Sequence, residues 1–416
     1  MLIILNILVW MGPFLFSLRK GKINTLHPQF IIPFYMVYFI LNSFIQDSTN
    51  WMNEGNRAII VGLVKLLPEL SVYNFSFEKT LFISLISGIF FHIGSLVFNK
   101  SIYNSNHEHV FLDKKTIVHG RKKNVILTSV IICSVCWLPY YFLSHLGGGT
   151  FWTYSLALSS AFIPVALFSI NRFIFFITLL FALLIATILK SKASYVYTFL
   201  PIIFYYIFFH FDFLKIFIKK KYLTSAIISF IIFIIIIIFL NIGNLGAKRL
   251  FHRDYAFEIF AILVESKELG LIQSQKSWIK NEVLEIVPSI LYKEKFTTHI
   301  NPAKRVAIEL FPETAKDRSG TYWNRHLLFA GYYDFGFIGS LISAFIYGLF
   351  FSYLWRVTKQ KVKEYNAKWP IFVYLPLPTF GAYFLAVGGL NYGLINMTIA
   401  SIILYLIFFT ARIKLS

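Results

Sequence analysis

The sequence predicts an all-α, polytopic transmembrane protein with about eleven spans (10–12) and one large, partly helical external loop. Of its 416 residues, 57% are hydrophobic and only 14% are charged, whereas soluble domains carry about 25% charged residues. Apolar runs of about 20 residues, the length that crosses a bilayer, recur along the chain. One long polar stretch, residues 242–335, interrupts them.

The predicted spans divide the chain into residues 1–241 with eight spans, the loop 242–335, and residues 336–416 with three spans. The clearest span is 222–241, which from Ala226 continues almost entirely as Ile and Phe. The short polar breaks at Asn171-Arg172 and at 190–192 also fit re-entrant helix pairs. The apolar runs are 2–18, 28–46, 80–98, 124–144, 153–170, 173–190, 193–210, 222–241, 336–355, 370–388 and 395–411.

The distribution of Lys and Arg predicts the orientation, because cytoplasmic loops carry an excess of these residues. One alternate set of short loops holds most of them, in clusters such as Lys219–Lys221 and Arg356–Lys368. The opposite set holds few, among them Lys190 and Lys192. We therefore expect the C-terminus to be cytoplasmic and the 242–335 loop to lie on the other side of the membrane.

Composition also excludes other classes of protein. A net charge of +20 indicates nucleic-acid binding only when the basic residues share a soluble face. Here they lie between apolar runs, so we expect no nucleic-acid partner. Cys133 and Cys136 lie inside an apolar stretch and are interpreted as packing residues, not as a disulfide framework. No cleavable leader is recognised, so the first span is expected to be retained.

The external loop contains one strongly patterned helix, predicted over Asp254–Leu269. Its acids, including Glu258 and Glu265, fall on one stripe at about 100° per residue, and the remaining positions are mostly apolar. The simpler interpretation is that the acids form the solvated face of the helix. The alternative hypothesis is that one acid, Glu258 before the others, faces a substrate cavity.

Basic residues accompany this loop at its entrance and near another external turn. Arg249 and Arg253 are four residues apart, so on one helix face they can bind a single anion. Contact with anionic lipid or a salt-bridge network with the nearby acids explains them as well. Lys190 and Lys192 lie on the cation-poor side, where an anionic head group or snorkelling at a helix end accounts for them.

The end of the loop, 320–336, is dense in aromatic and polar residues and leads directly into a span. Aromatic residues at a membrane boundary are common anchors. An anchoring role does not explain Arg325-His326, where a fixed cation precedes an imidazole able to exchange a proton near neutrality. His326 is therefore a candidate for a direct chemical role, although an inert loop histidine is the simpler interpretation.

Two loop segments carry a family resemblance. Residues 288–295 align with the pattern Pro-Arg-x-x-Trp-Pro-x-Lys-Pro, with Ser289 at the Arg position and Tyr292 at the Trp position. Residues 329–336 align with Gly-Glu-x-Tyr-x-Asn-Phe-Gly, with Asp334 at the Asn position and Ala330 at the Glu position. With many spans and a large late loop, the chain resembles the O-antigen polymerases, also called oligosaccharide repeat-unit polymerases.

The resemblance implies a glycosyltransferase of the bacterial inner membrane with a periplasmic loop. The growing glycan on undecaprenyl pyrophosphate is the donor, a hydroxyl of the next lipid-linked repeat unit is the acceptor, and the product is a surface polysaccharide such as O-antigen or capsule. A chain-length regulator and a flippase of the same pathway are expected partners. No Asp-x-Asp pair occurs in the loop, so neither a metal nor another cofactor is expected.

The chemistry implied by the resemblance gives roles to residues of this chain. Fixed cations stabilise the departing pyrophosphate, and a carboxylate or imidazole accepts the proton of the acceptor hydroxyl. The base is His326 or Glu258, with Asp334 as a further candidate. The pyrophosphate-binding residues are expected to be Arg249, Arg253, Arg325, Lys192 and Lys190.

Three other functions remain open at this stage. An O-antigen ligase has the same layout and donor but transfers to lipid A core. A flippase for lipid-linked oligosaccharide would favour charged residues within spans and internal pseudo-symmetry, and neither is evident. A membrane acyltransferase would also use an external His, but its thioester donor has less need of the loop cations.

Overall fold

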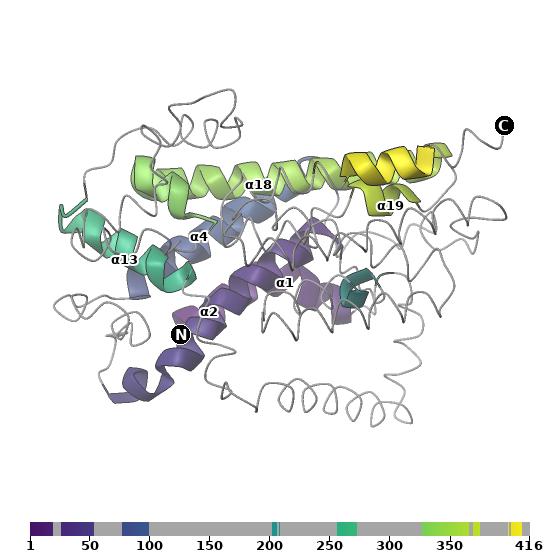
Figure 1. Cartoon of the computed structure of the whole chain (residues 1–416). Coiled ribbons are helices and arrows are strands. Elements are labelled where there is room, and N and C mark those ends of the chain that lie inside the picture. Colours follow the sequence, from purple (N-terminus) through teal and green to yellow (C-terminus); the bar gives the residue numbers. More distant parts are fainter. Residues whose placement is uncertain are drawn as a thin grey trace, which may run out of the picture.

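The structure of the protein is a computed structural model that describes residues 1–19, 26–53, 77–99, 202–205, 208, 256–272, 327–365, 369–374, 398 and 401–409. Within these ranges every regular element is a helix and none is a strand (Figure 1). The all-α prediction is confirmed for this part of the chain. The helices are α1 (Leu2–Arg19), α2 (Pro28–Asn53), α4 (Phe77–Leu96), α13 (Ala256–Glu268), α18 (Phe329–Tyr365) and α19 (Trp369–Tyr374).

Two described helices, α4 and α18, are long and apolar enough to cross a membrane. The predicted spans 2–18, 28–46, 80–98 and 336–355 coincide with α1, α2, α4 and α18. Helix α19 begins where the span 370–388 was expected, and the helical residues 401–409 lie inside 395–411. The predicted spans 124–144, 153–170, 173–190 and 222–241 lie outside the described residues, as does most of 193–210.

The polarity of α4 and α18 is reversed relative to a helix on the surface of a soluble protein. The exposed side of α4 carries large apolar side chains such as Phe82, Ile89 and Ile93, whereas Ser84 and Ser87 are completely buried. Helix α18 repeats the arrangement, with exposed Ile338, Ile342 and Ile346 and buried Ser340, Ser343 and Ser352. Apolar side chains outside and small polar ones inside are typical of helices that pack together in lipid.

Helices α4 and α18 lie along each other with their backbones in contact (Figure 1). A Cβ atom at Gly94 would collide with the carbonyl of Phe345 and would lie 3.1 Å from the amide nitrogen of Leu349. A Cβ atom at Gly348 would collide with the carbonyl of Phe91 and would lie 2.9 Å from the amide nitrogen of Ser95. Small residues at a helix contact allow this approach and so maximise van der Waals packing where lipid removes the hydrophobic driving force.

The contact between α4 and α18 also fixes their relative direction. The ring of Phe82 stacks on that of Phe337 near the start of both helices, and Phe98, just beyond the end of α4, contacts Tyr353 further along α18. Asn99, just beyond α4, donates a hydrogen bond from its side-chain nitrogen to the carbonyl of Ser352. The two helices therefore run parallel, as the predicted topology requires for the spans 80–98 and 336–355.

Helix α1 packs on the other side of α4 through polar contacts. The Asn6 amide donates to the carbonyl of Leu81 at 2.9 Å, and the Trp10 indole nitrogen donates to Ser84 Oγ at 3.2 Å. His92 Nε2 lies 3.0 Å from the carbonyl oxygens of Val9 and Trp10. Residue numbers increase together along both helices, so α1 runs parallel to α4 and α18.

The parallel arrangement brings like ends of the helices to one side. The carboxyl-terminal part of α18 carries Arg356, Lys359, Lys361 and Lys363, and α1 ends at Arg19. The Arg356 guanidinium lies 5.8 Å from the centre of the Phe98 ring, beyond the end of α4. The cation-rich end of this helix bundle is thus opposite the end where α4 and α18 begin.

Candidate functional site

The start of α18 is a helical hairpin rather than the simple entry of a loop into a span. Gly336 has φ 62° and ψ −144°, a non-helical conformation that breaks the helix. A Cβ atom at Gly331 would collide with the carbonyl of Gly339 and with Ser343 Oγ, and a Cβ at Gly339 would collide with the carbonyl of Gly331. Residues 329–335 therefore fold back along the beginning of the following helix.

This hairpin adds detail to the last residues of the predicted polar loop. The loop was predicted to end at 335, where the long apolar run begins. In the structure 329–335 are helical, and Phe329, Tyr332, Tyr333 and Asp334 are buried. The aromatic residues of this segment belong to the packed interior, whereas at the tip of the hairpin Phe335 is half exposed.

Helix α13 packs across the hairpin and the start of α4 (Figure 1). Its bounds, Ala256–Glu268, agree with the predicted helix Asp254–Leu269 to within two residues at each end, although Asp254 itself lies outside the described residues. The Phe257 ring contacts Phe77 at 5.7 Å between centroids, and the Phe260 ring meets Tyr332 edge to face at 5.8 Å. Glu268 forms an ion pair with Lys79 of α4.

Lys267 links α13 to the hairpin. Its Nζ donates hydrogen bonds to the backbone carbonyl oxygens of Tyr332, at 3.0 Å, and Tyr333, at 2.8 Å. The same nitrogen lies 5.6 Å from the centre of the Tyr332 ring. Burial lowers the pKa of the Lys267 ammonium below its ordinary value, and the nearby Asp334 carboxylate partly offsets this effect.

Asp334 is the candidate base that the structure brings into this cluster. Its side chain is 4% exposed, on the last turn before Gly336, and it interacts electrostatically with Lys267. A carboxylate in a region of low dielectric near a cation can accept a proton and release it again, which is what general base catalysis requires.

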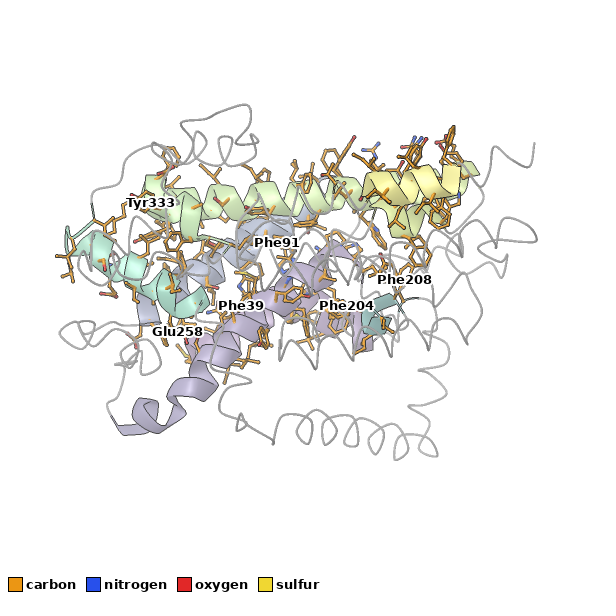
Figure 2. The ribbon with its side chains drawn as sticks, in the orientation of Figure 1. Phe39, Phe91, Phe204, Phe208, Glu258 and Tyr333 are labelled. Carbon is orange, nitrogen blue, oxygen red and sulfur yellow. The ribbon has the colours of Figure 1, made fainter. Side chains whose placement is uncertain are left out.

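Glu258 is also buried, at 4% exposure, but it lies elsewhere around α13. Nine residues separate it from Lys267, which at about 100° per residue places the two on opposite sides of the helix. Figure 2 shows Glu258 and Tyr333 on opposite sides of α13. Glu258 therefore does not lie on a solvated face of α13, whereas Glu268 at the end of the helix is exposed. The structure does not bring Glu258 to Lys267.

The other predicted site residues, Arg249, Arg253, Arg325, His326, Lys190 and Lys192, lie outside the described residues. Lys267 is the functional candidate that sequence reasoning missed. It was one cation among many in the loop, and its only local signal is its position in the last turn of a predicted helix. Within the described ranges, no three His, Cys, Asp or Glu residues gather in a way that could hold a metal ion.

Comparison with known proteins identified no relative of this chain. The chain matches no protein family, no curated protein and no solved structure.

Proposed function

We propose that this chain polymerises oligosaccharide repeat units carried on undecaprenyl pyrophosphate, at the periplasmic face of the bacterial inner membrane. The observation that carries the proposal is the buried Asp334 beside Lys267, at the start of a membrane-length helix. The residues around it, Tyr332 and Phe335-Gly336, are those that resemble the O-antigen polymerases, whereas the family pattern has Asn at position 334, so a base at Asp334 is proposed for this chain and not carried over from the family. The resemblance supplies the substrate class, and the buried acid supplies a base suited to it.

The proposed reaction transfers a glycan between two lipid carriers. The acceptor hydroxyl oxygen forms a bond to the anomeric carbon of the donor glycan. The bond from that carbon to the pyrophosphate oxygen breaks, and its electron pair leaves with undecaprenyl pyrophosphate. The acceptor proton passes to a base, for which Asp334 is our first candidate and His326 and Glu258 are the others.

The negative charge that develops on the pyrophosphate needs fixed cations, because neither a metal nor another cofactor forms part of the proposal. Arg249, Arg253 and Arg325, with Lys190 and Lys192, are the residues proposed for this role, since charge-assisted hydrogen bonds stabilise such a leaving group. The lipid carriers would reach the site from the bilayer, between spans.

The orientation of the proposal rests on the parallel course of α1, α4 and α18. Their cation-rich ends are expected to be cytoplasmic, because positively charged residues are retained on that side. Asp334 and α13 then lie toward the periplasm, where lipid-linked repeat units are joined. The full topology of about eleven spans, with a periplasmic loop over 242–335, belongs to this same proposal.

The test is glycan assembly in a strain whose chromosomal gene is deleted, complemented with Asp334→Asn. This substitution removes the base while keeping the shape of the side chain, so we expect long-chain glycan to fall by about 10²–10⁴-fold. Single repeat units should still reach the surface. The control is Lys361→Met, which alters an exposed ion pair with Glu364 at the other end of α18 and should leave the chain-length ladder unchanged.

The rival functions give different results in the same strain. Loss of a ligase leaves no repeat units on the surface, and loss of a flippase leaves them on the cytoplasmic side. Purified protein supplied with lipid-linked repeat units should form longer glycans without any other protein. Failure to do so, with normal assembly in cells carrying Asp334→Asn at normal protein levels, would reject the proposal.

A further inference from the structure

Breaking a helix at Gly336 creates a local need for a hydrogen-bond donor. The last carbonyls of any helix lack the amide partners that a further turn would supply. The carbonyls of Tyr332 and Tyr333 are in the last turn before the break, and Lys267 Nζ donates to both. A cation at a helix carboxyl end satisfies the carbonyls and is also favoured by the helix dipole.

Lys267 therefore closes a helix end that belongs to another part of the chain. It comes from α13, which is independently held against α4 by the Phe257–Phe77 ring contact and by the ion pair between Glu268 and Lys79. The segment that Lys267 caps is the one that carries Asp334. Movement of α13 away from the bundle would thus remove the cap and the cation from the candidate base together.

We infer that Lys267 is a positioning residue for Asp334, and that docking of α13 on the hairpin is a condition for activity. The inference rests on the proposed function. Its geometric basis is the pair of hydrogen bonds at 3.0 and 2.8 Å together with the Phe260–Tyr332 contact, which fix the short helix from the side of the loop. Lys267 need not touch the substrate to fulfil this role.

The charged residues near Lys267 determine how its interaction with Asp334 responds to pH. Asp334 of α18 interacts electrostatically with Lys267, Glu265 and Glu268 of α13 interact electrostatically with Tyr332, and Lys79 of α4 pairs with Glu268. Among the described residues, Lys267 is a cation of α13 that interacts electrostatically with Asp334 of α18. Removing its charge makes the ionised form of the Asp334 carboxyl less favourable, so the base would lose its function at a higher pH than in the unaltered protein.

The experiment compares Lys267→Met with Lys267→Arg in the purified full-length protein, using lipid-linked repeat units as substrate. For Lys267→Met we expect a roughly tenfold or greater loss of kcat and an acid limb of the pH–rate profile shifted to higher pH. Lys267→Arg keeps the charge and the donors, so it should retain most of the activity and the original acid limb. Lys361→Met is the matched control, because it removes an exposed lysine from the far end of α18.

Hydrogen–deuterium exchange of the peptide covering 327–336 gives a second readout that does not depend on activity. Its amides should exchange roughly tenfold faster in Lys267→Met than in the unaltered protein, because charged hydrogen bonds hold the segment. The Lys361→Met control should not change this exchange. If the unaltered protein makes no polymer, the proposed function fails, while faster exchange would still support the cap.

The inference is overturned by two results. One is exchange over 327–336 that is the same in Lys267→Met and Lys361→Met, which would mean that Lys267 does not hold the hairpin. The other is lower activity in Lys267→Met with an unchanged pH–rate profile, which would mean that Lys267 stabilises the fold without acting on Asp334.

Discussion

Two glycines with positive φ angles show how single residues shape the site. Gly270, with φ 71°, ends α13: its amide donates to the carbonyl of Lys267 at 3.2 Å, and the Leu271 amide donates to that of Ser266 at 2.9 Å. This is the hydrogen-bond pattern of a Schellman motif, which requires a left-handed residue. Gly336 has a similar φ but ψ −144°, a region that is almost restricted to glycine.

The difference between the two glycines gives a prediction at the residue scale. A Cβ atom would meet nothing within 4 Å at either position, so substitution tests the backbone conformation alone. We expect Gly336→Asn to destabilise the protein by about 1–3 kcal/mol. Gly270→Asn should cost much less, because Asn accepts the left-handed helical conformation.

Thermal unfolding of the purified protein in one detergent compares the two variants directly. Equal melting temperatures for Gly336→Asn and Gly270→Asn would contradict the break that the structure has at Gly336.

At the scale of helices, the contact between α4 and α18 holds the described bundle together. Ser340, Ala344, Gly348 and Ser352 recur at every fourth position of α18 and are all small. This row of small residues along one side of α18 lets the backbone of α4 approach closely, as is common for helices that pack in lipid. The site depends on this contact, because the hairpin is built on the first turns of α18 and α13 packs on the first turn of α4.

A matched pair of substitutions tests this packing. A Cβ atom at Gly94 would collide with the backbone of α18, whereas one at Gly12 of α1 meets nothing within 4 Å. Gly94→Ala should therefore destabilise the protein by about 1–3 kcal/mol, because the helices must separate. Gly12→Ala should be neutral or slightly stabilising, since Ala favours a helix over Gly.

Melting temperatures and yields of membrane-inserted protein measure both variants. The packing described here is wrong if Gly94→Ala is as stable as Gly12→Ala.

For the whole molecule, the distribution of side chains agrees with lipid as the surrounding solvent. Large apolar residues lie on the outside of α1, α4 and α18, while the buried side chains include Asn6, Ser17 and His27. The two ends of the helix bundle also differ in charge, because the cations of α18 gather at the end opposite the hairpin. The apolar exterior supports a membrane environment, and the position of the cations supports the proposed orientation.

Cysteine labelling of intact cells tests that orientation. Leu269, exposed at the end of α13, and Lys361, on the last turns of α18, lie at opposite ends of the described bundle. In a protein with Cys133→Ser and Cys136→Ser, a membrane-impermeant maleimide should label Leu269→Cys in spheroplasts. Lys361→Cys should be labelled only after the membrane is opened, and the reverse pattern would invert the proposed topology.

The sequence predicted the described helices and two of the candidate bases. It did not predict how the residues of the site come together. Apolar runs of bilayer length identified α1, α2, α4 and the long part of α18, because lipid imposes that length on each span separately. The acid stripe and the aromatic segment singled out Glu258 and Asp334. The roles of the basic residues named for pyrophosphate binding remain predictions, because these residues lie outside the described part of the chain.

By itself, then, the sequence determined the all-helical class of the described residues, the positions of the apolar helices α1, α2, α4 and α18, and the presence of helix α13. These depend on local hydrophobicity and on the period of the helix. The tertiary structure decided that 329–335 fold back on α18, that Lys267 of α13 caps them, and that Asp334 and Glu258 face different surroundings. The capping of 329–335 by Lys267 depends on a contact between residues 65 positions apart in the chain, and no local pattern of residues encodes which helix will supply the missing donor.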